Sequence, residues 1–297
     1  MTYGQIRFLL TKALPGVDPD LLDGWIQDRY TRILDRLKWS RLELETAIQT
    51  VAPYQTGTVA VTAGSNAVTL TGGTWTTAMT GRAFRVDGRS EYYEFTRASA
   101  TTGTLDRNYE GDTAAAATYK IVQFVYALPS DCRMLAANPR LLDAPAVLDR
   151  LSSRGELNAS APGRPSLGTP RVCAPYMDAA SDPPVMQIEL YPIPDDVYGI
   201  AVPYIAEQAD LSSTSTTLLP WLRPGCLKSG VLADGQKHLK DWNAADRYER
   251  DFESQLTEMA QDEARRKGPQ PMRAADWMVR HRVERALRSV RNPRILP

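Results

Sequence analysis

The stretch GTVAVTAGSNAVTLTGGTWTTAMTGRAFRVDG, residues 57–88, decides the fold that we expect for the middle of this chain. Thr, Val and Gly dominate it, and apolar side chains recur at every second position, at Val59 and Val61 and again at Val68 and Leu70. Such alternation has the period of a strand with one buried face. The turn residues AGSN and VDGRS separate the apolar runs. The stretch therefore predicts short strands joined by tight turns.

The same pattern continues to Phe124. We predict six strands in all: GTVAVT (57–62), AVTLT (67–71), AFRVDG (83–88), EYYEFTRA (91–98), TGTLD (102–106) and TYKIVQF (118–124). A small closed or sandwiched β module fits them. It is an insertion, because both flanks resume another pattern.

The flanks indicate helices. Residues 16–39 offer Asp18 as N-cap and Pro19 in a first turn, where proline is tolerated. Apolar residues then recur at helical spacing: Leu22, Ile26, Tyr30, Ile33 and Leu37. A second stripe lies within the long segment 225–266: Ala245, Tyr248, Phe252, Leu256 and Met259. Residues 183–207 between them predict two strands joined by a proline-rich turn at 193–196.

These elements predict an α+β fold. The N- and C-terminal helices form a helical core, which carries an inserted small antiparallel β module and an extended C-terminal tail. We expect residues 1–52 to be the N-terminal helical part of the core and residues 53–126 the inserted β module. Residues 127–268 form the remainder of the α/β core, with the strand-turn-strand and the long helix. Residues 269–297 form a basic C-terminal extension.

The charge of the chain is balanced overall, with 35 basic and 35 acidic residues. From Arg265 onward, however, ten basic residues face two acids, a net charge of +8. Arginines repeat every third residue from Arg282 to Arg294, beside a narrow apolar stripe that includes Val283 and Leu287. Arginine favours paired hydrogen bonds to carboxylates or phosphates. The tail is either a solvated terminus or a segment that docks on an acidic surface.

Catalytic chemistry has few candidates. The only histidines are His238 and His281, and no nucleophile elbow, zinc-protease pair or phosphate loop occurs. Carboxylate pairs such as Glu43 with Glu45, or Glu91 with Glu94, could hydrolyse glycosides, but solvated surface explains them more simply. We expect no enzyme and no catalytic residue.

Cofactors and membranes are not indicated either. Cys132, Cys173 and Cys226 are odd in number and form no CxxC pair, so neither a disulfide framework nor a zinc site is predicted. We expect no cofactor and no metal. No run of eighteen apolar residues occurs and no signal peptide is indicated, so we expect no membrane partner.

Two blocks of the sequence resemble a known family. The opening stretch, followed by LDRNYEGDT, YKIVQF and YALPSDCRML, resembles the β insertion of tailed-bacteriophage structural proteins. The block IELYPIPDDVYGIAVPYIAEQADLSS, with LLPWLRPGCLKSGVLADGQK after it, resembles the strand-turn-strand and return helix of phage head-to-tail adaptor (connector) proteins. The resemblance implies a helical core with a β insertion and, as in podovirus members, a C-terminal extension.

The resemblance further implies a homo-oligomeric ring, a dodecamer, in the virion neck between the capsid portal and the tail. The subunit is then made in the host bacterial cytoplasm. Its partners are the portal protein and a downstream tail protein, and DNA passes transiently through the channel. The portal-interface candidates are Arg282, Val283, Arg285, Leu287, Arg288, Val290 and Arg291. The tail-docking candidates are Trp75, Tyr92 and Tyr93.

Two other functions stay open at this point. The aromatic residues of the β module could form a sugar platform in a tail-associated receptor or carbohydrate-binding virion protein. A carboxylate pair could serve a peptidoglycan hydrolase. The basic tail leaves a further choice between portal and DNA as its partner.

Overall fold

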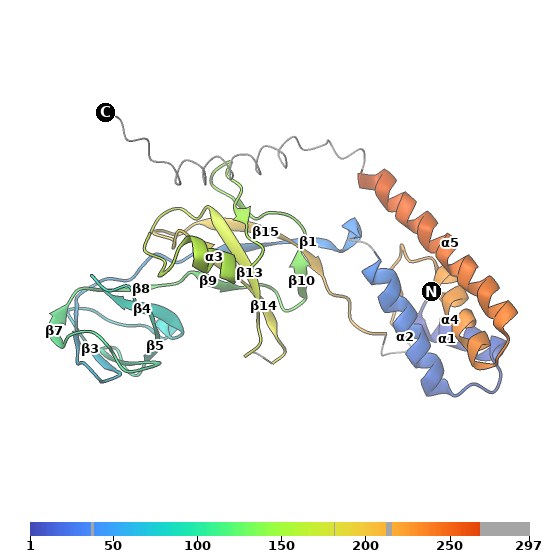
Figure 1. Cartoon of the computed structure of the whole chain (residues 1–297), viewed down its shortest axis with the longest axis horizontal. Coiled ribbons are helices and arrows are strands. Elements are labelled where there is room, and N and C mark those ends of the chain that lie inside the picture. Colours follow the sequence, from blue (N-terminus) through green and yellow to red (C-terminus); the bar gives the residue numbers. More distant parts are fainter. Residues whose placement is uncertain (37–38, 181, 212–215, 268–297) are drawn as a thin grey trace, which may run out of the picture. The chain divides into compact units, whose positions relative to one another are not determined.

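The computed structural model describes residues 1–36, 39–180, 182–211 and 216–267. These residues divide into two compact units. The helical unit comprises Met1–Ser40 and the described residues from Asp210 onward, and the β unit comprises Arg41–Ala209. Figure 1 shows the helices of the first unit and the strands of the second. The helical unit is therefore built from both ends of the chain.

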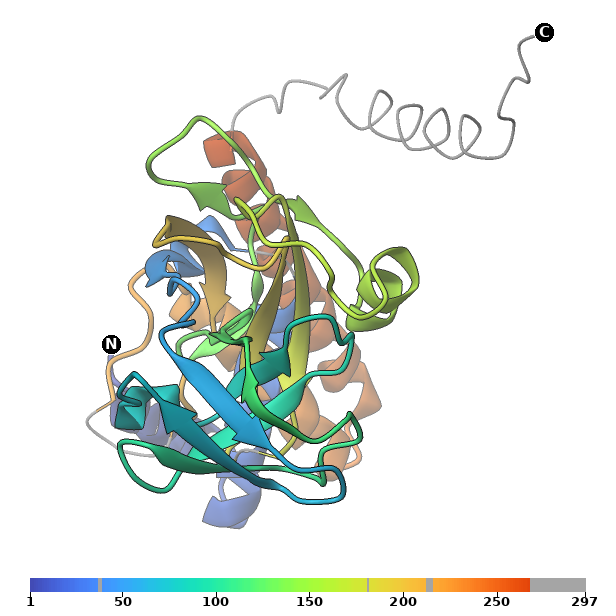
Figure 2. The ribbon, with the colours of Figure 1, turned by 90° about the vertical axis from the view of Figure 1, so that its left-hand side faces the viewer.

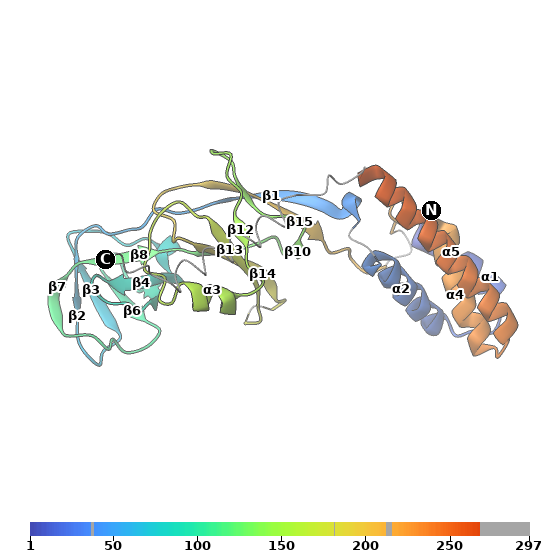
Figure 3. The ribbon, with the colours of Figure 1, turned by 45° about the horizontal axis from the view of Figure 1, so that its top comes forward.

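Four helices form the helical unit: α1 (Tyr3–Ala13), α2 (Pro19–Asp35), α4 (Pro224–His238) and α5 (Trp242–Lys267). A capping box of Thr2 and Gln5 begins α1. As expected, the Asp18 side chain caps α2 by accepting a hydrogen bond from the Asp20 amide at 2.8 Å, with Pro19 at the first helical position. Figure 3 shows α5 running alongside α4.

The helices meet along the stripes that their spacing indicates. The buried apolar residues include Leu22, Ile26, Tyr30 and Ile33 of α2 and Ala245, Phe252, Leu256 and Met259 of α5. The segment expected as one long helix is two, α4 and α5, because the chain turns between them at Lys240, whose φ is +63°. No helix among the described residues is long and apolar enough to span a bilayer.

A seven-stranded antiparallel sheet, nearly closed into a barrel, occupies residues 58–122 of the β unit (Figure 2). Its strands, in the order β7-β2-β3-β6-β5-β4-β8, are β2 (Thr58–Val61), β3 (Ala67–Thr71), β4 (Arg82–Val86), β5 (Tyr93–Arg97), β6 (Thr102–Leu105), β7 (Ala114–Ala117) and β8 (Tyr119–Val122). The six expected strands are present. The seventh, β7, consists of four alanines, a residue depleted in strands, so the sequence pattern did not indicate it.

The barrel has its own hydrophobic core. Trp75, Phe84, Phe95 and Tyr119 are each at most 1% exposed. The Trp75 and Phe95 ring centroids lie 4.6 Å apart in an edge-on arrangement, a geometry that aromatic pairs favour. This core fills the barrel with side chains.

Two further sheets complete the β unit. One contains β1 (Glu43–Gln49), β15 (Gly199–Ala206), β10 (Cys132–Leu135) and β11 (Arg140–Leu141). The other has the order β12 (Asp149–Arg150), β13 (Val172–Asp178), β14 (Val185–Tyr191), β9 (Val125–Ala127). They share one core, to which Leu135, Ile188 and Val202 contribute. A short helix, α3 (Arg154–Ser160), contacts β13, and η1 (Ser40–Leu42) and η2 (Thr77–Met79) are single 3₁₀ turns.

The two strands expected around the proline-rich turn both exist, but they do not pair with each other. β14 pairs with β13 and β9, whereas β15 pairs with β1, β10 and β11. Most residues of β15 are buried, including Ile200 and Val202. Each strand therefore needs neighbours on both sides, and each becomes the centre of a different sheet.

The predicted helical core is wrong. About 30% of the described residues lie in strands and 31% in helices, and the helices do not dominate. The β unit outside the barrel has its own apolar core. One reason that the sequence did not reveal this second core is β1, whose sequence ELETAIQ carries exposed glutamates and gives a weak strand signal. A second reason is that β11 and β12 are very short, so they leave no alternating pattern in the sequence.

Candidate interaction surfaces

The predicted portal-interface residues lie outside the described residues. This holds for the whole set: Arg282, Val283, Arg285, Leu287, Arg288, Val290 and Arg291. His281 lies outside them too. Their role stays a prediction.

The three tail-docking candidates lie in different surroundings. Trp75 is 1% exposed and its Nε1 donates to the Tyr119 hydroxyl at 3.1 Å. Tyr93 is 3% exposed and packs against Tyr109. Tyr92 is half-buried, and its hydroxyl donates to the Arg164 carbonyl at 3.2 Å. Trp75 and Tyr93 thus shape the barrel from inside, and a docking role for the three residues stays a prediction.

A buried arginine holds three helices of the helical unit together. Arg29 of α2 is 4% exposed, and its Nε donates to Asp234 of α4 at 2.6 Å. Its Nη1 and Nη2 donate to the two carboxylate oxygens of Glu249 on α5 at 2.9 and 2.7 Å. All three Arg29 nitrogens therefore have carboxylate partners, as a buried charge requires. Hydrogen bonding to Arg29 lowers the pKa of Glu249 to about 2.

Several large apolar side chains of the helical unit face solvent. Phe8 of α1 is 59% exposed, and Trp242 at the start of α5 is 62% exposed. Leu9, Leu21 and Leu239 are exposed as well. The Lys12 ammonium lies 4.4 Å from the Phe8 ring centroid. Exposed aromatic residues of this size are common in contact surfaces between proteins.

A second buried charge cluster anchors α3 and the following loop to β14. Glu189 is 1% exposed and accepts from Arg164 Nε at 2.7 Å and from Arg154 Nε at 2.6 Å. Arg164 also donates to the Ala161 carbonyl at 2.7 Å. The Arg154 guanidinium lies 4.8 Å from the Tyr176 ring centroid. The cluster therefore holds Tyr176 of β13 in position, at the side of a pocket.

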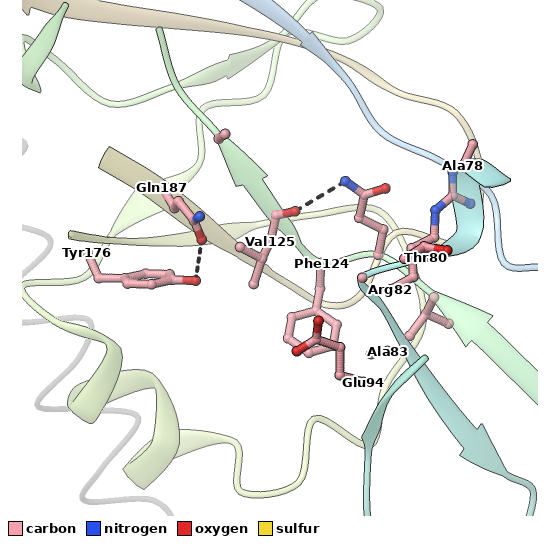
Figure 4. Close-up of a pocket in the computed structure, with 13 residues that line it drawn as sticks. Ala78, Thr80, Arg82, Ala83, Glu94, Phe124, Val125, Tyr176 and Gln187 are labelled. Atoms are coloured by element: carbon pink, nitrogen blue, oxygen red, sulfur yellow. Dashed lines mark hydrogen bonds between the residues drawn. The ribbon is translucent and has the colours of Figure 1, made fainter. Parts of the chain in front are cut away.

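That pocket has a volume of about 510 Å³. It lies where the chain leaves the barrel after β8 and enters the sheet of β12, β13, β14 and β9, called the second sheet below. In Figure 4, Tyr176 and Gln187 lie on one side, Arg82 lies on the other, and Phe124 and Val125 lie between them. The other lining residues are Ala78, Thr80, Gly81, Ala83, Glu94, Val122, Gln123 and Ala127.

Within the described part of the chain, some polar groups of the pocket have hydrogen-bond partners and one buried group does not. The Tyr176 hydroxyl donates to Gln187 Oε1 at 2.6 Å, and Gln187 Nε2 donates to Asp178 at 2.9 Å. Arg82 differs, because its Nε is buried and has no hydrogen-bond partner among the residues that the structure describes. Burial lowers the pKa of Arg82 below its usual value. Sequence reasoning missed this pocket, because its residues come from separate strands and form no motif.

The candidates for catalysis lie in ordinary structural surroundings. His238 packs edge-on against the Trp25 ring. Glu45 pairs with Arg140 at 3.0 Å, with both side chains about half exposed. The three cysteines are buried, and burial raises the pKa of the Cys173 thiol to about 12, far from nucleophilic. Within the described ranges, no group of three or more His, Cys, Asp or Glu residues could hold a metal ion.

The chain belongs to the SU10 adaptor protein family, whose model matches residues 103–275. The protein is therefore a bacteriophage adaptor, a structural component of the virion, and the resemblance noted in the sequence is confirmed at this level. The match begins in β6 and includes β7 and β8 of the barrel, the strands of the two further sheets except β1, and the helices α4 and α5. No individually curated protein matches the chain.

Proposed function

We propose that this protein is a head-to-tail adaptor that assembles as a ring beneath the portal, closes the neck of the virion and docks the tail. The family match over residues 103–275 carries the proposal. The ring is a dodecamer of podovirus type, made from subunits that are synthesised in the host cytoplasm. The portal protein and a downstream tail protein are its partners, and DNA passes through its channel.

Ring assembly requires heterologous contacts, in which two different surfaces of the subunit meet. The helical unit offers apolar side chains for such contacts, among them Phe8 and Trp242. The carboxylates around Arg29 hold α2, α4 and α5 in a defined arrangement. A unit with a fixed shape and exposed aromatic residues supports the assembly of identical copies.

The basic extension is the proposed portal contact. We propose that Val283, Leu287 and Val290 pack against the portal, while the arginines Arg282, Arg285, Arg288 and Arg291 pair with acidic groups. Exposed ion pairs contribute only about 0–1 kcal/mol each. The apolar side chains therefore supply much of the affinity, and the arginines set the register and the association rate.

The β unit is the proposed docking face for the tail. The barrel has a self-contained core and a sheet of its own within the β unit. Trp75 and Tyr93 maintain its shape from inside, and Tyr92 lies nearer the surface. A module with its own packed core supports recognition by a downstream tail protein.

The test is sedimentation of the purified protein with its portal protein. We expect the full chain to comigrate with the portal, and a chain truncated after Gly268 to remain folded but to lose stable attachment. Replacing Val283, Leu287 and Val290 by Ser should weaken attachment more than replacing Arg282, Arg285 and Arg288 by Gln. Absence of comigration by the full chain would refute the adaptor ring.

The same experiment distinguishes the partner of the tail. If the truncated chain attaches as well as the full one, the extension is not the portal contact. If the tail binds DNA instead, affinity for a DNA duplex should fall steeply with salt, in proportion to the phosphates neutralised. Affinity for the portal that depends on the apolar stripe should change less with salt.

A further inference from the structure

We propose that the pocket between the barrel and the second sheet binds a carboxylate side chain carried on an extended polypeptide segment, with Arg82 as its anchor. The inference concerns the β unit alone and rests on no part of the proposed ring or its portal contact. The acidic residue enters as a side chain of a partner polypeptide, and the segment on either side of it crosses the pocket.

The pocket has the size and lining of a binding site. Its volume of about 510 Å³ falls within the range of about 300–1,000 Å³ that is typical of sites for small ligands or short segments. Phe124 and Val125 supply apolar surface, and Thr80, Gln123 and Gln187 supply polar groups. The ion pairs of Glu189 fix one side by holding Arg154 against Tyr176.

Arg82 identifies the chemistry of the ligand. A buried donor without a partner is costly, and nearly all such groups in folded proteins are satisfied. Arg82 lines the pocket, and its Nε has no partner among the described residues. A carboxylate can pair with a guanidinium through two parallel hydrogen bonds. An acidic side chain in the pocket would therefore balance the charge of the Arg82 guanidinium, whose Nε the described residues leave unpaired.

The surrounding charge favours a single carboxylate over a polyanion. Glu94 also lines the pocket and is exposed, so it would repel a phosphate or a nucleic-acid backbone. The β unit, residues 41–209, carries 13 basic and 18 acidic residues, a net charge of −5. A polypeptide segment with one acidic residue and neutral neighbours meets less repulsion. Its backbone amides can form hydrogen bonds with the side chains of Gln123 and Gln187.

The first test uses N-acetyl-aspartate N-methylamide as the probe and its asparagine counterpart as the control. The full chain is labelled with ¹⁵N, and the Arg82 Nε–Hε signal is assigned from its absence in Arg82→Gln. We expect this signal to shift and saturate with the aspartate probe only. No shift, or an equal shift with the asparagine probe, would overturn the proposal.

Variants measure the contribution of the guanidinium. We expect Arg82→Gln to weaken binding of the aspartate probe at least about tenfold, the loss expected for a charge-assisted hydrogen bond. The matched control is Arg85→Gln on the same strand. Arg85 lies over the Tyr92 ring, 4.8 Å from its centroid, and is outside the lining. Equal affinity of the two variants would contradict the assignment of Arg82.

Stability separates a binding role from a structural one. Because Arg82 Nε has no partner, Arg82→Met should leave the thermal midpoint of the free protein unchanged or raise it. Arg97→Met is the comparison, since Arg97 Nε donates to the Trp75 carbonyl at 2.9 Å and its loss should lower the midpoint. If Arg82→Met destabilises the barrel as much as Arg97→Met, Arg82 serves the fold and the proposal fails. None of these measurements involves the portal, so failure here leaves the proposed ring unaffected.

Discussion

Arg29 and Glu249 show how single residues hold the helical unit together. Their side chains are joined by two hydrogen bonds, and the second carboxylate of the cluster comes from Asp234. A buried charge whose partner is removed destabilises a protein by about 3–5 kcal/mol. The stability of this unit therefore depends on the ionisation of the Glu249 carboxylate.

We expect the helical unit to lose stability in acid through Glu249. Hydrogen bonding to Arg29 lowers the folded-state pKa of Glu249 from 4.5 to about 2. A depressed pKa contributes stability that is present above pH 4.5 and lost as the pH falls toward 2. The contribution is on the order of 3 kcal/mol. Urea unfolding followed by helical circular dichroism should show this fall.

Glu249→Gln should be less stable at pH 7 and should show a flatter stability profile between pH 4.5 and 2. The control is Glu258→Gln on the same helix. Glu258 pairs with Arg223 at the surface, with side-chain exposures of 58% and 42%, so its loss should change stability by only about 0–1 kcal/mol. An unchanged acid profile in Glu249→Gln would contradict this account.

Among the elements, α4 lies closely against two neighbouring helices at Gly230. A Cβ at this position would lie 2.9 Å from Arg29 Cδ and 2.9 Å from a ring carbon of Phe252. Neither neighbour can move freely, because Arg29 is held by two carboxylates and Phe252 is fully buried. Glycine at this position lets α2 and α5 approach α4.

We expect Gly230→Ala to destabilise the helical unit by about 1–3 kcal/mol, the usual effect of overpacking. The matched control is Gly24→Ala in α2, where nothing lies within 4 Å of the added Cβ. That change should stabilise the protein by about 0.5–1 kcal/mol, because alanine favours a helix over glycine. Thermal unfolding of both variants tests the pair, and a stabilised Gly230→Ala would show that the contact is not tight.

For the whole molecule, the barrel is the part that should be removable. Tyr54 and Ile121 exchange two backbone hydrogen bonds, at 2.9 and 2.8 Å, so the chain enters and leaves the barrel at adjacent points. The barrel core draws on residues 59–121 and is complete in itself. A short linker can therefore replace it without opening the other two sheets.

We expect a chain in which such a linker replaces residues 57–124 to keep the helical circular dichroism signal and a cooperative unfolding transition. The aromatic signal of Trp75 and its neighbours should disappear from the near-ultraviolet spectrum. The isolated barrel, residues 52–124, provides the complementary measurement and should fold alone, because its strands close on themselves. Global unfolding of the shortened chain would show that the barrel is needed by the rest.

Much of the local structure follows from the sequence. The alternation of Val59, Val61, Val68 and Leu70 indicated strands, and all four residues are buried in the barrel core. The cap at Asp18 and the stripes of α2 and α5 were equally visible. Such patterns report which side of an element is buried, and that is a property of neighbouring residues. The resemblance to phage adaptor proteins was also recognisable from the sequence, and the family match confirms it at the level of a phage adaptor.

Only the tertiary structure decided which elements pair and which side chains meet. β14 and β15 follow one another in the chain but belong to different sheets. The apolar pattern of a strand indicates that it is buried between other strands, but it does not indicate which strands those are. Arg29 meets Asp234 across 205 residues, and Arg82 shares a pocket with Tyr176 and Gln187 from another sheet. These contacts arise from the packing of distant segments, whose partners carry no mark in the local periodicity.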